Sequence, residues 1–275
     1  MTVSPPILYE ESENIGILTV NRLEARNALN WEAQTQFAQQ VRELRGRSRP
    51  LSALIIAGAG EKAFVAGGDL NELAAIPEPE TGVKLRETML QALNELEALP
   101  TVVIGAVSGH AAGGGIELLA ACDLRLASTD AKFHFAQVKM GLTSGWGGVE
   151  RLVKIIGQSQ TLYLMLGGRS ISAAEAYHVG LVHELVDLSR HKENTHIKEI
   201  ALEWARSLSA LPNDAQRSLK ALIHFAGQGH PQAEVQALEA SHFLNLFGRG
   251  NNKEALSAFT ERRPPKFNQK GKAKG

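Results

Sequence analysis

Residues 102–119 read VVIGAVSGHAAGGGIELL, an apolar, β-branched run followed by a cluster of glycines and a second apolar run. The first part, Val102–Val107, comes just after Pro100 and predicts a buried strand. A short helix is expected to begin near Gly114, and the glycines before it can bring bare backbone close to a ligand. A strand that leads through glycines into a helix indicates an α/β core.

The flanking sequence repeats this alternation from residue 7 to about residue 185. Ile7–Glu11 and Ile15–Val20 predict a hairpin. Asn30 is expected to cap a helix that runs from Trp31 to about Leu44. Further elements are predicted as strands at Leu51–Ala57, Leu124–Ala127 and Lys132–Phe135, and as a helix from about Thr81 to Leu99.

The strand-like stretches stop after about Val186, and helical periodicity takes over. One apolar stripe at helical spacing comprises Ile197, Ile200, Ala201, Trp204, Ala205, Leu208 and Leu211. We therefore predict three parts: a core over residues 1–186, a helical region over 187–262 and a basic, mostly unstructured tail over 263–275. The apolar excess of the helical region indicates contact with a partner subunit or with the active face of the core.

Composition restricts the classes of function. The 275 residues carry 29 Lys and Arg against 29 Asp and Glu, so no overall field attracts nucleic acid or an anionic membrane. Cys122 is the single cysteine, which excludes an internal disulfide and a Cys-rich zinc site. We find neither a secretion-signal pattern nor the roughly 20 apolar residues that cross a bilayer, and a cytoplasmic location is expected.

Several familiar motifs occur in this sequence without the helix or the residue spacing that they require. The glycines of Gly58–Ala63 fit a loose dinucleotide pattern, but another glycine-containing loop follows where a helix is required. The spacings of His191 with His196 and of His224 with His230 do not match helical zinc ligands. For His110 and His134 a structural role is favoured. No metal site is predicted.

Two glycine clusters, Ala66–Leu70 and Gly113–Leu119, each follow an apolar stretch. The second runs into a helix, so its first amides lack intrahelical acceptors and could bind a developing oxyanion. A purely structural alternative is that Gly113–Gly115 only allow tight helix packing. In that case Glu117 still gains about 0.3–1 kcal/mol from the helix dipole without any catalytic role. Because Glu117 lies in the apolar run IELLAAC, where a carboxylate is costly to bury, function is favoured.

Four segments in order resemble the crotonase superfamily, the enoyl-CoA hydratase/isomerase family. They are Asn21–Asn30, Ala63–Leu70, Gly109–Leu118 and Ala131–Gly148. The resemblance extends from Ile7 to Lys266. It implies an α/β fold, a crotonase-like spiral of ββα units with a C-terminal all-helical region that builds trimers, often paired into hexamers.

The resemblance also implies roles for individual residues. It assigns a thioester oxyanion hole to the N–H groups of Gly68 and Gly114, and the first of two carboxylate positions to Glu117. The residues implied in substrate binding are Ala25, Arg26, Ala28, Ala66, Gly67, Asp69, Leu70, Gly113, Gln137, Trp146 and Lys266. Of these, Arg26 and Lys266 are candidates for the CoA phosphates, and Trp146 either caps the acyl pocket or fills the core. No cofactor beyond the CoA of the substrate, and no metal, is implied.

One position departs from the hydratase pattern. The family's second glutamate is replaced by Gln137, and an amide neither donates nor accepts a proton usefully near neutral pH. The stretch Lys139–Gly157, with Trp146-Gly147-Gly148, is similar to ethylmalonyl-CoA and related acyl-CoA decarboxylases, which keep the first glutamate. A decarboxylase or other single-carboxylate lyase is therefore favoured over an enoyl-CoA hydratase.

Two hypotheses of another class stay open at this point. The chain could be a CoA-binding scaffold without turnover, or an RNA-associated relative that uses its basic tail for phosphate contacts. Glu117 argues against an inactive site, and the neutral net charge argues against a nucleic acid partner. The expected partners are an acyl-CoA and further copies of the chain, in a homotrimer or a dimer of trimers.

Overall fold

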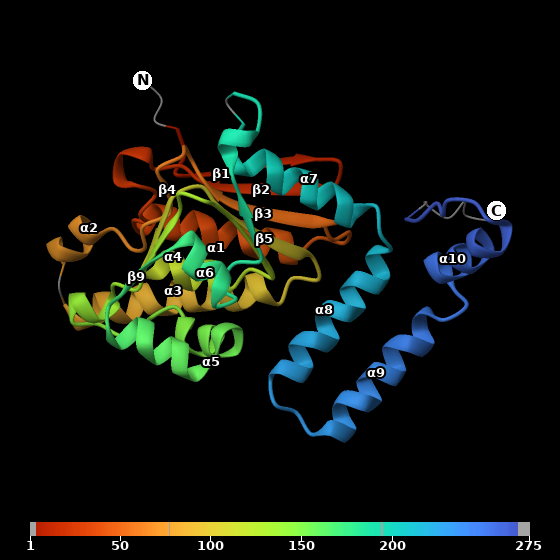
Figure 1. Cartoon of the computed structure of the whole chain (residues 1–275). Helices are drawn as coiled ribbons and strands as arrows, with labels where there is room; N and C mark the ends of the chain where they lie inside the picture. The colour runs from red at the N-terminus through yellow and green to blue at the C-terminus, as the bar shows by residue number, and fades with distance from the viewer. Residues whose placement is uncertain (1–3, 77, 194, 269–275) are drawn as a thin grey trace.

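The computed structural model describes residues 4–76, 78–193 and 195–268, and a six-stranded sheet lies at its centre (Figure 1). Its strand order is β1-β2-β3-β5-β7-β10. The strands span Ile7–Ser12 (β1), Ile15–Val20 (β2), Ala53–Gly58 (β3), Val102–Val107 (β5), Leu124–Ser128 (β7) and Glu184–Val186 (β10). Only β1 pairs antiparallel with its neighbour, through the predicted hairpin. The parallel strands β3 and β5 are buried almost throughout, which explains their continuous apolar sequence.

A second sheet of four short strands positions the glycine clusters. Its order is β4-β6-β8-β9, with β4 at Ala63–Val65, β6 at His110–Ala112, β8 at Lys132–His134 and β9 at Ser170–Ser172. Strands β4 and β6 pair in parallel, and each ends immediately before one glycine cluster. Of these strands only β8 was expected from the sequence, because three residues are too few to show an alternating pattern.

Of the helices of the core, those that begin at Trp31, Pro79 and Gly114 were predicted, with small shifts of their ends, and the others were not. The helices span Trp31–Arg45 (α1), Leu70–Ala75 (α2), Pro79–Glu97 (α3), Gly114–Ala120 (α4), Gly148–Leu166 (α5) and Ala173–His178 (α6). Three short 3-10 turns lie at Leu23–Ala25 (η1), Gln137–Met140 (η2) and Leu188–Arg190 (η3). The side chain of Asn30 accepts from the Ala33 N–H at 2.9 Å, which confirms the predicted cap of α1.

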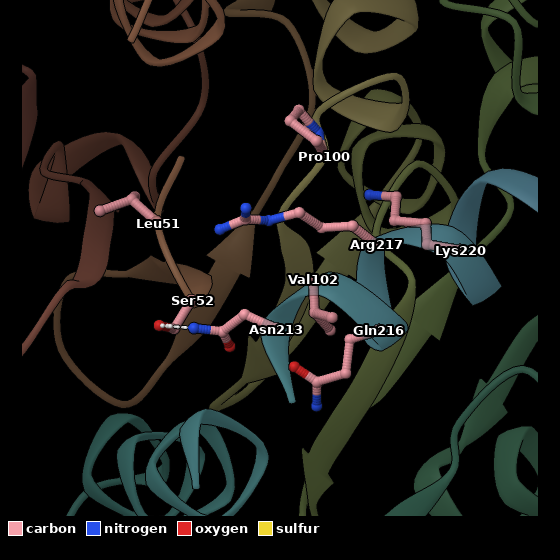
Figure 2. Close-up of a pocket in the computed structure, with 8 residues that line it drawn as sticks. All are labelled: Leu51, Ser52, Pro100, Val102, Asn213, Gln216, Arg217 and Lys220. Carbon is pink, nitrogen blue, oxygen red and sulfur yellow. Dashed lines mark hydrogen bonds between the residues drawn. The ribbon is translucent and has the colours of Figure 1, made fainter. Parts of the chain in front are cut away.

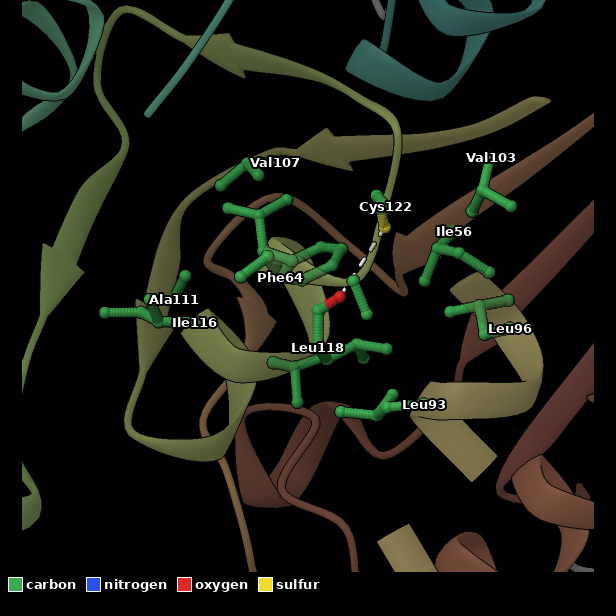
Figure 3. Packing of buried hydrophobic residues seen from close by; sticks show 14 of the residues in the cluster. Ile56, Phe64, Leu93, Leu96, Val103, Val107, Ala111, Ile116, Leu118 and Cys122 are labelled. Atoms are coloured by element: carbon green, nitrogen blue, oxygen red, sulfur yellow. Dashed lines mark hydrogen bonds between the residues drawn. The ribbon is translucent and has the colours of Figure 1, made fainter. Parts of the chain in front are cut away.

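Helices α3 and α4 cover one face of the six-stranded sheet. Figure 3 shows the contact, where Leu93 and Leu96 of α3 and Leu118 of α4 pack close to Ile56 of β3. Cys122 lies in the same cluster, and burial raises the pKa of its thiol to about 12. The single cysteine is therefore a core residue and not a nucleophile.

Helix α7 (Ile197–Ser209) covers the opposite face of this sheet. Its buried residues Ile197, Ile200, Ala201 and Ala205 belong to one cluster with the apolar side chains of β3 and β5. The apolar stripe predicted from Ile197 onward thus faces the core. Its last member, Leu211, is beyond the helix and is 48% exposed.

Three further helices form an arm that extends away from the core (Figure 1). The arm consists of α8 (Asn213–Gly227), α9 (Gln232–Leu246) and α10 (Gly250–Glu261). Polar contacts fix its root, where Lys220 Nζ lies 2.7 Å from Asp123 Oδ2 and 2.8 Å from the Thr101 carbonyl oxygen. Large exposed apolar side chains on the arm are Leu219, Ile223, Phe243, Leu244, Phe247, Leu256 and Phe259. No helix of the described residues is both long and apolar enough to cross a membrane.

A cleft of about 210 Å³ separates the root of α8 from the amino ends of β3 and β5 (Figure 2). Asn213 Nδ2 crosses it to donate to Ser52 Oγ at 3.2 Å, and Arg217 also faces it. The cleft lies away from the glycine clusters, and no carboxylate, histidine or cysteine lines it.

Residues 263–268, at the start of the basic tail, form no helix or strand but make several side-chain contacts. Arg263 forms ion pairs with Glu254 and Glu261, both at 2.6 Å, and Asn268 accepts a hydrogen bond from Asn213. Arg263 is therefore a structural cation rather than a purely solubilising one. Residues 269–275, with Lys270, Lys272 and Lys274, lie outside the described residues.

Candidate active site

The first glycine cluster leaves β4 and forms a short bridge with Leu29. The Leu29 N–H donates to the Gly67 carbonyl at 2.7 Å, and the Asp69 N–H donates to the Leu29 carbonyl at 3.1 Å. In a parallel bridge these bonds come from the residues on either side of Gly68, so the Gly68 N–H points away from Leu29. Within the described part of the chain, this N–H has no acceptor.

The second glycine cluster leaves β6 and opens helix α4. Gly113 adopts a left-handed φ of 51°, and its N–H donates to the His134 carbonyl at 3.0 Å. The next residue, Gly114, is the first of the helix, and its amide has no acceptor among residues 4–76, 78–193 and 195–268. Such a first-turn N–H lies at the positive end of the helix dipole.

The two clusters contact each other. A Cβ built on Gly67 would lie 3.1 Å from the Gly114 nitrogen and 3.1 Å from the Ala112 carbonyl oxygen. The two clusters thus lie in contact, and each carries one N–H without a partner in the described structure, which suits an oxygen that gains negative charge.

Glu117, in the first turn of α4, is 2% exposed and accepts four hydrogen bonds. The donors are Gln137 Nε2 at 3.0 Å, Ser144 Oγ at 2.6 Å, Trp146 N–H at 2.8 Å and Gly148 N–H at 3.0 Å. A Cβ at Gly148 would lie 2.4 Å from Glu117 Cγ, so the carboxylate requires a glycine there. These four donors compensate for burial of the carboxylate.

Gln137, at the start of η2, occupies the position where the hydratase pattern has a second glutamate. Its Nε2 donates to Glu117, and its Oε1 is buried without a hydrogen-bond partner in the described structure. No second carboxyl group touches Glu117 among the hydrogen bonds of the described residues. The site therefore pairs one carboxylate with one amide.

Trp146 lies beside both glycine clusters. A Cβ on Gly114 would lie 2.3 Å from its indole, and a Cβ on Gly68 would lie 4.0 Å from it. The Trp146 carbonyl accepts from Arg151 Nη1 at 2.9 Å, and Arg151 is itself buried against Glu97. At 4% exposure the indole is part of the core and also an apolar wall next to the two amides.

Asp69 contacts Arg22 rather than open solvent. Arg22 Nη1 lies 2.8 Å from Asp69 Oδ2, and the other Asp69 oxygen caps α2 at the Asn71 N–H. Burial by itself would raise the pKa of Asp69, but the hydrogen bond and charge of Arg22 outweigh it and lower the pKa below its ordinary value. This pair connects the segment before η1 to the Gly68 loop. No pattern in the sequence pointed to this role of Arg22.

The other residues implied in substrate binding fall into two places. Ala25, in η1, and Ala28 lie in the segment that leads to Leu29, while Arg26 is exposed. Ala66 and Leu70 flank the Gly68 loop, and the Leu70 side chain is 53% exposed. Lys266, by contrast, follows α10, and its N–H donates to Glu254 Oε1 at 2.8 Å.

Two contacts of Glu117 were missed by the sequence reading, namely Ser144 and the amide of Gly148. A serine four residues before a glycine-initiated helix is a weak signal, because many loops have this composition. Among the described residues no histidine side chain hydrogen-bonds to Glu117; His110 and His134 instead bond to each other at 2.8 Å on the second sheet. No cluster of three or more metal-ligating side chains occurs among the described residues.

Comparisons with known proteins identify the family. The family described as Enoyl-CoA hydratase/isomerase matches residues 10–270. The short-chain-enoyl-CoA hydratase of Clostridium acetobutylicum is 34% identical over 94% of this chain and 95% of its own length. The ethylmalonyl-CoA decarboxylase of Mus musculus is 34% identical over 91% of this chain and 76% of its own.

Solved structures share the whole architecture. The crystal structure of an enoyl-CoA hydratase from Bacillus anthracis superposes with a TM-score of 0.87 at 28% identity, over 95% of this chain and 98% of that one. The fold expected from the resemblance, with two sheets and a C-terminal helical region, is thereby confirmed. With a family match over nearly its full length and relatives above 30% identity, the chain belongs to the enoyl-CoA hydratase/isomerase (crotonase) family.

Proposed function

We propose that the protein acts on an acyl-CoA thioester, through an enolate whose oxygen is bound by the N–H groups of Gly68 and Gly114. Their free amides at the ends of paired strands support this role. Removing one such donor typically costs about 10²–10³ in rate, so the pair supplies most of the rate acceleration. Glu117, in the first turn behind Gly114, handles the proton.

The reaction we favour is decarboxylation, or another lyase reaction that needs a single carboxylate. The observation that carries this choice is Gln137, which stands in the second carboxylate position and donates to Glu117 at 3.0 Å. Hydration needs one group to manage water and another to exchange the α-carbon proton. An amide performs neither task near neutral pH.

Decarboxylation suits the chemistry of the remaining groups. In a malonyl-type thioester, the electrons of the breaking carbon–carbon bond enter the enolate as CO₂ leaves, and the two amides stabilise the oxygen. A proton from Glu117 or from water then adds to carbon 2. The apolar wall of Trp146 disfavours a hydrated carboxylate relative to neutral CO₂.

Hydration is the second candidate, and one observation favours it. Gln137 Oε1 is a buried acceptor without a partner, and it adjoins the carboxylate of Glu117. A water molecule could donate to both oxygens and be activated by Glu117 alone. The relatives include both hydratases and a decarboxylase at similar identity, so their names do not favour either reaction.

Incubation with crotonyl-CoA and, separately, with methylmalonyl-CoA and ethylmalonyl-CoA tests the choice. We expect CO₂ release from a malonyl-type substrate, strongly reduced in Glu117→Gln and unchanged in the surface variant Glu150→Gln, which alters an exposed pair with Lys154. Rapid hydration by the native protein that survives Glu117→Gln would exclude the assignment. Saturable binding with no product would indicate a scaffold instead.

For CoA we propose a groove formed by Ala25, Ala28, Ala66, Gly67, Asp69, Leu70 and Gly113. Arg26 and Lys266 are proposed phosphate contacts. Lys266 follows α10, in the helical region that we propose contacts a second copy of the chain, so it would act on the site of a neighbouring subunit. Lys266→Ala should weaken binding of an acyl-CoA more than that of a short pantetheine thioester, and an equal loss for both would remove it from the phosphate site.

We propose that the chain forms a homotrimer or a dimer of trimers. The arm supports this because it presents large apolar side chains away from its own core, with Phe259 86% exposed and Ile223 66% exposed. Light scattering coupled to size exclusion should give three or six times the 29.7 kDa chain mass. A monomer at micromolar concentration would contradict this proposal.

A further inference from the structure

The two oxygens of the Glu117 carboxylate are held unequally. Oε2 accepts from Ser144 Oγ, from the Trp146 N–H and from the Gly148 N–H, whereas Oε1 accepts only from Gln137 Nε2. A carboxylate oxygen has about two lone-pair positions, so three donors saturate Oε2. Only Oε1 keeps capacity for a proton or a further hydrogen bond.

Ser144 uses all of its own hydrogen-bonding capacity at this point. Its oxygen accepts from the Gly148 N–H at 2.9 Å and from the Val149 N–H at 3.3 Å, both in the first turn of α5. The Gly148 hydrogen is shared between this oxygen and Glu117 Oε2, and the Val149 hydrogen also points to Ser144 Oγ, so the hydroxyl hydrogen must point away from both amides. It points to Glu117, at 2.6 Å. The helix terminus thus fixes the direction in which Ser144 donates.

We propose that Ser144 is a positioning residue that anchors Glu117 through Oε2 and so turns Oε1 toward the reacting carbon. This inference rests on the proposed proton-handling role of Glu117. Ser144 connects the carboxylate on α4 to the amino end of α5, two elements that are far apart in the sequence. Among the described residues it is also the only side-chain donor to Oε2, because the other two donors are main-chain amides.

The neighbouring Thr143 provides a matched control. It carries a hydroxyl one residue away, is exposed, and reaches only the Ser144 carbonyl at 3.4 Å. Thr143→Ala therefore removes the same chemical group from the same loop without touching Glu117. Ser144→Thr retains the hydroxyl, and it serves as the conservative variant that should restore the anchor.

The first test separates kcat from KM with whichever acyl-CoA the native protein converts. For Ser144→Ala we expect kcat to fall by about 10–100-fold with KM changed less than about threefold, because the group acts on proton transfer. Ser144→Thr should recover most of kcat. In a Glu117→Gln background, Ser144→Ala should cost less than about threefold more. A loss borne by KM, or an equal loss in both backgrounds, would overturn the proposal.

The second test does not depend on turnover. A crystal structure of Ser144→Ala should show the Glu117 carboxylate rotated away from the Trp146 and Gly148 amides, or in two orientations. An unmoved carboxylate overturns the role of Ser144 even if Glu117 is essential. If the native protein converts no acyl-CoA, the proposed function fails, and this structure still decides whether Ser144 anchors Glu117. Should Ser144→Ala not fold, the structure of Ser144→Val, together with the kcat of Ser144→Thr, replaces it.

Discussion

A Cβ atom on Gly114 would lie 2.3 Å from one ring atom of the Trp146 indole and 2.6 Å from two others. Small rotations of the indole cannot relieve contacts this short. Alanine at this position must displace a tryptophan that is 4% exposed and fixed at both its N–H and its carbonyl. We expect Gly114→Ala to lower kcat/KM for an acyl-CoA by about 10²–10³-fold, because the clash moves the main-chain N–H, which alanine keeps, out of line with the oxyanion.

The control for this substitution is Gly82→Ala. Gly82 lies within α3, and a Cβ there has no neighbour within 4 Å. It should leave kcat/KM unchanged and raise the free energy of unfolding by up to about 1 kcal/mol, because alanine favours the helix. Full activity in Gly114→Ala would contradict this requirement for glycine beside the Trp146 indole.

Gln137→Glu should shift the reaction toward hydration. The new carboxyl group would stand about 3 Å from Glu117, where two carboxylates cannot both ionise, and the pair would share one proton. We expect hydration of crotonyl-CoA to rise by at least about 10², the lower range of acid–base catalysis. The measurement is loss of the enoyl absorbance, with Gln137→Leu as the variant that removes the amide without adding an acid.

Much of the core could be predicted because its elements are long and strongly patterned. The buried strand Val102–Val107 and the cap at Asn30 each carry a local signal that the structure confirms. The strands β4, β6 and β9 have three residues each, and their pairing depends on contacts far along the chain. No window of the sequence contains that information.

The residues of the candidate site also differ in whether local sequence reveals them. Gly68, Gly114 and Glu117 are recognisable because glycines before a helix and an acid in an apolar run are local features. Ser144 is not, since its role depends on α5 placing two amides beside its oxygen. The ion pair of Arg22 with Asp69 spans 47 positions and was likewise invisible.

Lys220→Met should destabilise the protein. The Lys220 and Asp123 side chains are 9% and 14% exposed and lie 2.7 Å apart. Burial alone would raise the pKa of Asp123, but the hydrogen bond from His224 and the charge of Lys220 lower it. Removing the cation leaves a buried carboxylate without its main partner, and we expect a loss of about 3–5 kcal/mol in urea unfolding. The exposed Lys253→Met should change it by less than about 0.5 kcal/mol.

Stability should fall in mild acid partly through His134. Burial, followed by the charges of His110, Lys132 and Lys139, lowers the pKa of His134 below its ordinary value of 6.5. The unfolded chain then binds more protons than the folded one as pH drops through 6.5, so the free energy of unfolding decreases until the lowered pKa is reached.

Urea unfolding at about pH 7.5 and about pH 5.5 measures this effect. His134→Gln should make the decrease smaller. Some decrease should persist, because burial and the charge of Arg125 also lower the pKa of His183, with the same sign. An identical decrease in the native protein and in His134→Gln would refute the contribution of His134.

Strands β4 and β6 are hydrogen-bonded neighbours, and each delivers one of the two glycine amides. The two glycine clusters therefore leave the second sheet about one strand spacing apart, roughly 4.8 Å. The outer helices can change to fit a different acyl group while this strand spacing stays constant. The same fold could therefore accept new substrates without any change to the strands that carry the two glycine amides.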